Sequence, residues 1–208
     1  MYLVYKNSLC TIAASEATEP HHGLFKSRDM RSLTPFKVLF TPEDRSKSYC
    51  CFYDWWADIC ETKPLSLRGW VVQERLLSPR TMHFATPVFW ECRELIACET
   101  YPNGLDRHRM AATDKIWYTM RTNREDSRKW NNVVDTFSGC ALTRLEDKLV
   151  AISGVAKALQ PIFQDDYLAG LWRKHLLPGL LWTVDKDADG KDRDVVRSSP
   201  YRGRTSII

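Results

Sequence analysis

The stretch RGWVVQERLLSPRTMHF, residues 68–84, combines an apolar pattern with three consecutive polar side chains. Its apolar spacing predicts a short helix over residues 68–77. Ser78 is expected to end this helix, because the residue before a proline is disfavoured in the α conformation. A strand is expected next, so the stretch joins a helix to a sheet. The position of Gln73, Glu74 and Arg75 around the helix decides whether each of these side chains is buried or exposed.

A helical wheel separates the three polar side chains. Gln73 falls within the apolar arc, Glu74 lies at its edge one turn from Trp70, and Arg75 lies on the opposite side. A buried amide without a hydrogen-bond partner costs about 1–3 kcal/mol. Gln73 is therefore predicted to be a buried hydrogen-bond junction, whereas Arg75 is predicted to face away. The apolar arc consists of Trp70, Val72, Leu76 and Leu77.

Glu74 has two interpretations. A carboxyl desolvated beside an indole suits acid/base chemistry, which makes Glu74 a candidate catalytic residue. The alternative is a structural ion pair with Arg68 or Arg80, both of which lie close along the chain. The structural interpretation is favoured, because a single sequence gives little support for assigning a catalytic role.

Residues 81–92 predict a β-hairpin that turns near Thr86. In that register one face carries Met82, Phe84, Val88 and Trp90, and the other carries Thr81, His83, Phe89 and Glu91. His83 and Glu91 are then diagonal neighbours. Such a pair can orient an imidazole for base catalysis, with Cys92 or Cys98 as a nearby nucleophile. No cysteine-protease signature surrounds them, so a hydrogen-bonded histidine is the favoured interpretation.

The remaining elements are predicted from apolar spacing and turn residues. Residues 7–15 suit a buried strand or turn, 97–114 a polar loop, and 126–139 a helix.

After the helix over 126–139, a further helix is expected to begin at a capping box formed by Thr143 and Glu146 and to end at Pro161. Another helix is expected from Asp165.

No metal site is predicted. Residues 185–196, DKDADGKDRDVV, match the first positions of a calcium loop, but Val196 stands where the bidentate glutamate is required. His21 and His22 lack partners at zinc-type spacing. The chain has no phosphate-binding loop and no nucleophile elbow, so no cofactor is evident.

Composition narrows the function classes further. The chain has 208 residues, 44% of them hydrophobic, with 8 tryptophans, which is enough for a substantial core. The 30 basic and 26 acidic residues are dispersed, so no nucleic-acid interface is expected. Apolar runs are too short to span a bilayer. Seven cysteines without regular spacing favour free thiols in a reducing compartment, and the cytoplasm is the expected location.

Several ordered segments together resemble the fungal heterokaryon incompatibility (HET) domain proteins. They include RGWVVQERLLSPRTMHF and then FWEC within 68–92, VYKNSLCTIAAS and GLFKSRD upstream, and WNNVVDTFSGCALTRLEDKLVAISGVAKAL and DDYLAGLWRKHLLPGLLW downstream. The resemblance covers about residues 2–182. Typical members carry further motifs before and after these segments, so the chain is expected to be an internal piece of such a protein.

The resemblance implies an α+β or incomplete α/β fold, similar to Toll-receptor-like (TIR) domains, followed by a helical region. We expect the C-terminal part of a HET domain over 1–125, a helical extension over 126–184 and a loose charged tail over 185–208. The motif residues that the resemblance selects are Arg68, Trp70, Gln73, Arg80, Trp90 and Cys92, with Glu74 and Glu91. Packing is expected of the tryptophans and a salt-bridged network of the arginines and glutamates.

Two functions follow from the resemblance. The first is intracellular self/non-self recognition and programmed cell death through protein partners or self-association. The alternative is NAD hydrolysis, with NAD as a substrate of the full-length family and Glu74 or Glu91 as the acid/base residue. This alternative rests on fold-level analogy. A nucleic-acid-binding module ranks third, and it would show binding that weakens steeply with salt.

Overall fold

The chain adopts a mixed α+β fold. The computed structural model describes residues 1–29, 31, 33–34, 36–38, 49–51, 59, 62–105, 127–186 and 192–198. Its N-terminal elements are α1 (Tyr2–Lys6), β1 (Thr11–Ala13), the 3-10 helix η1 (Pro20–His22), β2 (Phe36–Val38), β3 (Tyr49–Cys51), α3 (Gly69–Leu77), β4 (Arg80–His83), β5 (Phe89–Cys92) and β6 (Ile96–Cys98). The C-terminal elements are α5 (Ser127–Ser138), η4 (Leu145–Asp147), α6 (Lys148–Phe163), β7 (Tyr167–Leu168), β8 (Leu171–Trp172), η5 (Arg173–His175), α7 (Leu176–Leu180), β9 (Trp182–Lys186) and β10 (Asp192–Ser198).

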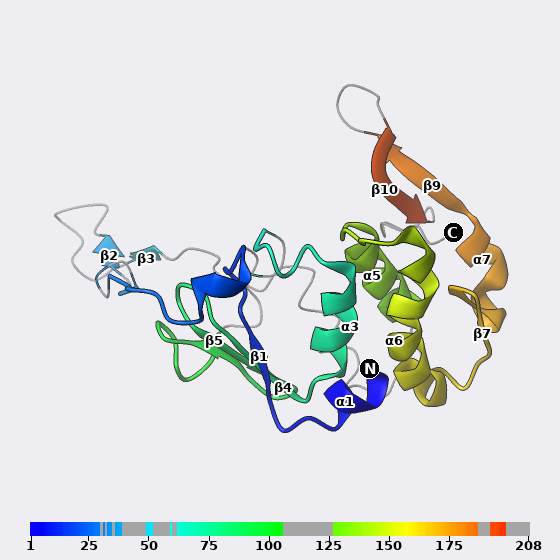
Figure 1. Ribbon diagram of the computed structural model, residues 1–208. Helices are drawn as coiled ribbons and strands as arrows, with labels where there is room; N and C mark the ends of the chain where they lie inside the picture. The colour runs from blue at the N-terminus through cyan, green and yellow to red at the C-terminus, as the bar shows by residue number, and fades with distance from the viewer. Residues whose placement is uncertain are drawn as a thin grey trace.

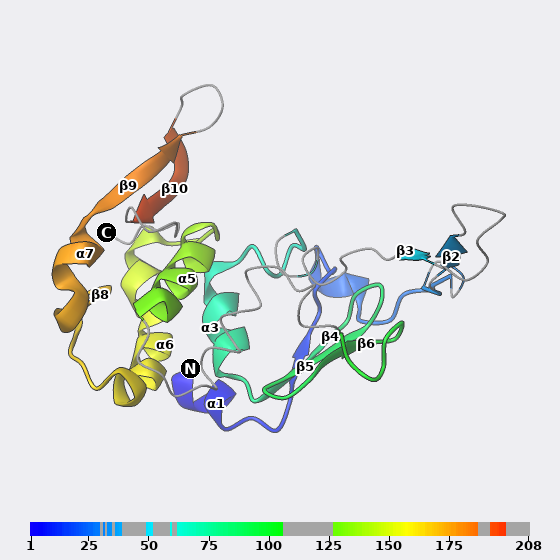
Figure 2. The ribbon, with the colours of Figure 1, turned by 180° about the vertical axis from the view of Figure 1, so that it is seen from behind.

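The central sheet has four strands in the order β1-β4-β5-β6. Strand β1 pairs with β4 in parallel, and the other neighbours pair antiparallel. Parallel strands need a crossover connection, and α3 lies in the connection between β1 and β4. Figure 1 shows α3 between this sheet and the helices α5 and α6, and Figure 2 shows the same order from behind.

Helix α3 confirms the helix predicted over 68–77. Ser78 ends it in an extended conformation, with φ −66° and ψ 129°, as expected before a proline. The helix is covered on two sides rather than one. Val72 and Leu76 pack against α5, α6 and Trp172 in one core. The opposite side faces the sheet (Figure 1), where Arg75 binds Glu91 of β5.

Two hydrophobic cores result from this arrangement. The larger one lies among the helices and contains Val72, Leu76, Trp130, Val133, Val134, Phe137, Ala151, Ile152, Val155, Ala156, Leu159, Phe163 and Trp172. The smaller one lies at the sheet and contains Ile59, Ala85, Phe89 and Cys98. The prediction of a helix over 126–139 is confirmed, because α5 supplies Trp130, Val133 and Phe137 to the larger core.

Gln73 is buried, as the helical wheel predicts, and its Oε1 accepts a hydrogen bond from the backbone N–H of Gly154 at 3.0 Å. The amide therefore ties α3 to α6. Gly154 is needed at this contact because a Cβ on it would overlap the Gln73 side chain.

Gly154→Ala is expected to lower the free energy of unfolding by about 1–3 kcal/mol, because the added methyl displaces Gln73 and breaks its hydrogen bond. Urea denaturation measures the change, with Lys157→Ala, an exposed position of α6, as the control. A Gly154→Ala protein more stable than wild type, as for an unobstructed helical glycine, contradicts the contact.

The start and end of α6 differ from the prediction. The capping box is wrong, since Thr143 and Glu146 are both exposed and η4 precedes α6 without a side-chain cap. Pro161 does not end the helix, because it lies in the last turn and α6 continues to Phe163.

The prediction of a helix from Asp165 is also wrong. The chain instead turns back through Ala169, at φ 46°, and Gly170, at φ 106°, and so forms the β7–β8 hairpin. Trp130 holds this turn by donating its indole N–H to the Gly170 carbonyl at 2.7 Å. Tertiary contact with α5 thus overrides the helical spacing of the apolar residues.

Two further segments correct the sequence prediction. Strand β6 occupies the start of the loop expected over 97–114, and residues 106–114 lie outside the described part of the chain. The tail expected to be loose from residue 185 contains backbone pairing, since β9 and β10 form an antiparallel hairpin over 182–198. Of the segment 185–196, which resembles a calcium loop in sequence, residues 187–191 lie outside the described part of the chain.

Candidate functional site: a buried serine–histidine–glutamate–arginine cluster

Four polar side chains meet between α3 and the sheet, and we call Ser15, Arg75, His83 and Glu91 the buried cluster. The Arg75 guanidinium donates to both Glu91 carboxylate oxygens, from Nε at 2.9 Å and from one terminal nitrogen at 3.0 Å. His83 Nε2 lies 3.0 Å from Glu91 Oε2, and His83 Nδ1 lies 3.2 Å from the Ser15 hydroxyl. Ser15, His83 and Glu91 are 1%, 4% and 3% exposed.

The strand register brings the cluster together. Thr81 pairs with Glu91 and His83 pairs with Phe89, so the side chains of these four strand residues share the face that looks toward α3. Burial alternates along both strands in the same way, with Thr81, His83, Phe89 and Glu91 buried. The predicted faces of the hairpin are therefore confirmed, and so is the neighbourhood of His83 and Glu91.

Arg75 corrects the prediction that it faces away. It does lie opposite the apolar arc of α3, but that side of the helix is covered by the sheet, and its side chain is only 16% exposed. A bidentate arginine–carboxylate pair is a strong and directional contact. The junction between helix and hairpin is thus formed by Arg75 and Glu91.

The environment of Glu91 holds its carboxyl as an anion. Burial alone would raise the pKa of this carboxyl, but the Arg75 charge and the hydrogen bonds from His83 and Arg75 outweigh burial and lower the pKa from 4.5 to about 2. A carboxyl with this pKa is ionised throughout the physiological range. It therefore has no proton to donate as a general acid.

The order serine, histidine, glutamate is the order of groups in a hydrolase triad, but the arrangement differs. Ser15 contacts Nδ1 and Glu91 contacts Nε2, which reverses the two imidazole nitrogens of the serine-protease arrangement. A nucleophile must also reach its substrate, and Ser15 is 1% exposed. The geometry supports a satisfied polar network that fixes α3, β1, β4 and β5 relative to one another.

Glu74 lies apart from the cluster, near α1. It interacts with the Tyr5 hydroxyl, and burial together with this carboxylate raises the pKa of Tyr5 to about 12. Arg80 donates to the Leu9 carbonyl at 3.3 Å. Over the described ranges, neither Arg68 nor Arg80 forms the expected ion pair with Glu74, because α1 occupies the side of α3 that carries the carboxylate.

The other motif residues lie on different surfaces. Trp70 packs, partly buried, against the larger core. Trp90 and Cys92 follow the alternation of β5 and lie on the sheet face opposite Glu91. The Cys92 thiol accepts a hydrogen bond from the Leu95 backbone and does not share the face of His83. Cys98 is on the face of His83, but Phe89 lies between their strands.

Sequence reasoning missed Ser15 and the neighbouring Glu16. The Glu16 carboxylate binds Lys63 at 3.2 Å, Lys26 at 3.3 Å and the Thr86 backbone N–H at 3.2 Å. Burial works to raise the pKa of Glu16, but these contacts dominate and lower it. The sequence indicates their role only through position, since both residues follow the strand β1 closely. At that position a side chain can contact the turn of the neighbouring hairpin.

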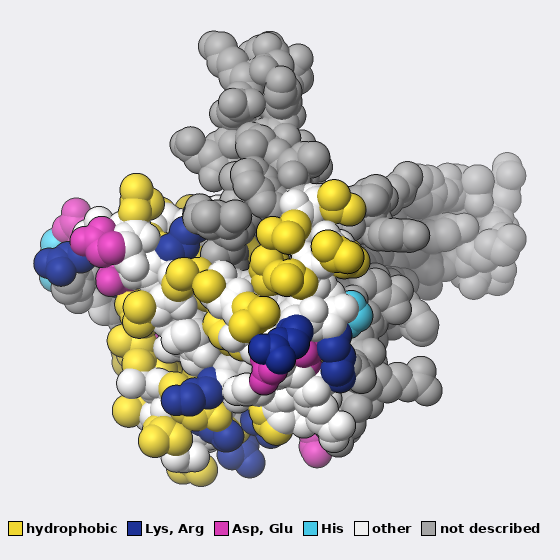
Figure 3. Space-filling model, turned by 90° about the vertical axis from the view of Figure 1, so that its right-hand side faces the viewer, with side chains coloured by type: hydrophobic (Ala, Val, Ile, Leu, Met, Phe, Trp, Pro, Cys, Tyr) yellow, Lys and Arg dark blue, Asp and Glu magenta, His cyan; other side chains and the backbone are white. Residues whose placement is uncertain are grey.

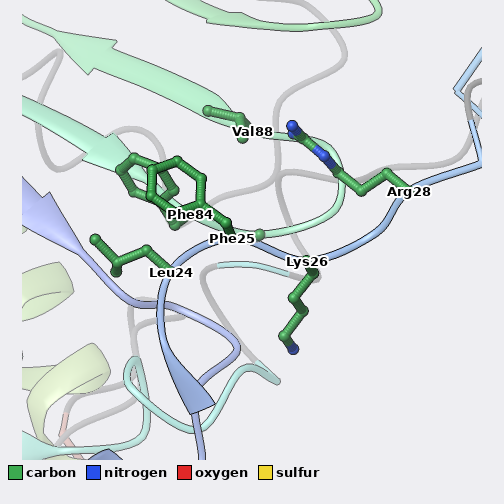
Figure 4. Close-up of a pocket in the computed structure, with 7 residues that line it drawn as sticks. Leu24, Phe25, Lys26, Arg28, Phe84 and Val88 are labelled. Carbon is green, nitrogen blue, oxygen red and sulfur yellow. The ribbon is translucent and has the colours of Figure 1, made fainter. Parts of the chain in front are cut away.

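A shallow pocket lies beside this turn and is separate from the buried cluster. Phe84, Ala85 and Val88 line it from the hairpin, and Leu24, Phe25, Lys26 and Arg28 line it from the preceding loop. Figure 4 shows Arg28 extending toward Val88 and Lys26 pointing the other way. Arg28 binds Glu99 at 2.6 Å and Lys26 binds Glu16, so both cations are neutralised by carboxylates of the chain itself.

Comparison with known proteins identifies one family. Residues 1–74 match the family model described as Heterokaryon incompatibility protein (HET). No curated protein and no solved structure matches the chain. The matched part contains β1, Ser15 and α3 up to Glu74, and it ends one residue before Arg75. Within the described residues, no helix has both the length and the apolar character needed to cross a membrane.

Proposed function

We propose that this heterokaryon incompatibility (HET) domain protein takes part in fungal self/non-self recognition and promotes programmed cell death by associating with a second copy of itself. The family match over residues 1–74 supports the biological process. The proposed mode of action, self-association, is supported by an exposed apolar surface on α7.

The α7 surface consists of Leu177, Leu180 and Leu181, which are 79%, 48% and 60% exposed. Leu177 and Leu180 are three residues apart and lie on one side of the helix, and Leu181 is the residue that directly follows it. Exposed hydrophobic side chains lie on the side of the molecule that carries α7 (Figure 3). Contiguous apolar surface of this kind is typical of protein association sites.

A charge pair beside the α7 surface is compatible with a second copy as the partner. Arg173 and Asp166 bind each other within the chain, 3.1 Å apart and each more than half exposed. In a two-fold contact the same patch meets itself, so the ion pair of one copy can meet that of the other and each Arg173 can also contact Asp166 of the other copy. The surface is in this respect self-complementary.

Leu177→Asp is expected to abolish self-association of the full chain in analytical ultracentrifugation and to abolish growth arrest when the protein is expressed in fungal cells. A charged side chain at the centre of an apolar contact is desolvated without a partner. The matched control is Leu145→Asp, since Leu145 is 77% exposed and belongs to η4 rather than to the α7 surface. Association and growth arrest that both survive Leu177→Asp contradict the proposal.

NAD hydrolysis with a TIR-like fold, which the resemblance implies, ranks second. Glu91 is buried and held by three hydrogen bonds, so its carboxylate is not free to approach a nucleotide. Glu74 is partly exposed and is the residue on which this alternative depends. NAD measured in the same cells separates the two functions: loss of NAD that Glu74→Gln prevents would replace association with enzymatic action.

A further inference from the structure

We propose that Glu19, His21 and His22 form a binding site for a divalent transition-metal ion, with Zn²⁺ as the ion to test. The three residues lie at the N-terminal cap and within the 3-10 helix η1, on the loop that leaves β1. We call them the η1 triad. This site is independent of the α7 surface and of the buried cluster.

The donor atoms of the η1 triad already stand close together. One ligand atom of each residue lies within 4.8 Å of the other two. His21 Nε2 and Glu19 Oε2 are 3.1 Å apart, and the two imidazole rings have centroids 5.0 Å apart at 71°. Ligands of tetrahedral zinc, with bonds of about 2.0–2.1 Å, stand roughly 3.3 Å from one another. One pair therefore has the required spacing, and the third donor needs only a rotation of an exposed side chain.

The backbone and a neighbouring hydroxyl orient the triad. The His22 N–H donates to the Glu19 carbonyl at 3.2 Å, which closes the turn and brings position 19 beside positions 21 and 22. The Thr18 hydroxyl lies 2.9 Å from His22 Nδ1. When this hydroxyl accepts the Nδ1 proton, Nε2 carries the lone pair that a metal needs, an arrangement common around metal-binding histidines.

The donor set decides the class of ion. Two imidazoles and one carboxylate suit Zn²⁺, Ni²⁺ and Cu²⁺, whereas Mg²⁺ and Ca²⁺ prefer oxygen ligands alone. Three protein ligands leave a fourth position of tetrahedral zinc for water or for a side chain of another molecule. The exposure of all three residues leaves that position open to solvent.

Calorimetric titration of the metal-free full chain with ZnCl₂ tests the proposal. We expect one ion per chain and at least tenfold weaker binding in His22→Ala and in Glu19→Gln. Thr18→Val should weaken binding roughly tenfold, because the hydroxyl that contacts His22 Nδ1 is lost. His175→Ala, an exposed histidine on η5, is the control and should bind as wild type does. MgCl₂ should give no binding at the same concentrations.

Cysteine thiolates of the chain can also bind Zn²⁺. The His22→Ala and Glu19→Gln variants distinguish such binding from binding at the η1 triad. Zinc binding unchanged in both His22→Ala and Glu19→Gln places the ion elsewhere and overturns the proposal. Absence of stoichiometric binding in the wild-type chain overturns it as well. A paramagnetic ion such as Cu²⁺ provides the second measurement, because it should broaden the amide resonances of residues 18–23 selectively.

Discussion

Glu91→Gln is expected to lower the free energy of unfolding by about 3–5 kcal/mol, the range found when one partner of a buried ion pair is removed. The amide cannot neutralise Arg75, whose guanidinium then remains largely buried without a counter-charge. It also replaces one carboxylate oxygen that accepts from both Arg75 and His83. Urea denaturation followed by tryptophan fluorescence measures the loss.

Glu94→Gln is the matched control, because Glu94 is exposed in the turn that follows β5. Its replacement should change stability much less than that of Glu91, since an exposed ion pair contributes at most about 1 kcal/mol. An Arg75→Met and Glu91→Gln double variant should lose less than the sum of the two single losses, since the two residues act on each other. A Glu91→Gln protein as stable as the Glu94→Gln protein would show that the junction contributes nothing.

The stability of the wild-type chain is expected to fall in acid by an amount that Glu91→Gln removes. The folded pKa of Glu91 is lowered, so its contribution is fully present above the ordinary value of 4.5 and is lost as pH falls toward about 2. The difference between those two values corresponds to about 3 kcal/mol. Urea denaturation at a series of pH values from neutral to acid, on both proteins, measures it.

The expected pattern is convergence of the two stability curves as the pH is lowered. The wild-type advantage over Glu91→Gln should be constant near neutrality and should shrink below about pH 4.5. Curves for wild type and Glu91→Gln that stay parallel into acid would mean that Glu91 titrates alike in the folded and unfolded chains.

The local pattern of residues 68–92 was sufficient to predict α3 and the hairpin. The proline after Ser78 ends the helix, and alternation about Thr86 places His83 and Glu91 on one face. The wheel also placed Gln73 correctly, although its partner, Gly154, lies 81 residues away along the chain and no local pattern reveals it.

Arg75 shows why the rest of the site was not predictable. A wheel gives the direction of a side chain relative to the apolar arc, but not what covers the other side of the helix. Here β4 and β5 cover it, so an arginine expected in solvent becomes the anchor of a buried carboxylate. The sequence indicates the role of Ser15 even less, since Ser15 reaches the buried cluster only through the parallel pairing of β1 with β4.

The C-terminal region was mispredicted for a related reason. Tyr167, Leu171 and Trp172 have helical spacing, but left-handed backbone at Ala169 and the contact of Trp130 with Gly170 turn the segment into a hairpin. The Trp130 ring then packs edge to face against Tyr167 and Trp172, with centroids 5.4 and 5.7 Å apart, and Tyr167 and Trp172 pack in a tilted arrangement at 5.3 Å. Such contacts are non-local and outweigh a weak helical preference.

The central claim is that Glu91 is a structural anion that joins α3 to the sheet rather than an acid/base residue. Carbon-13 NMR titration of the Glu91 side-chain carboxyl, assigned by comparison with Glu91→Gln, tests it most directly. The predicted result is a chemical shift that stays constant as pH falls through 4.5 and changes only toward about pH 2 or on acid unfolding. A titration midpoint at or above 4.5 in the folded protein would contradict the claim, because that carboxyl would not be held by Arg75 and His83.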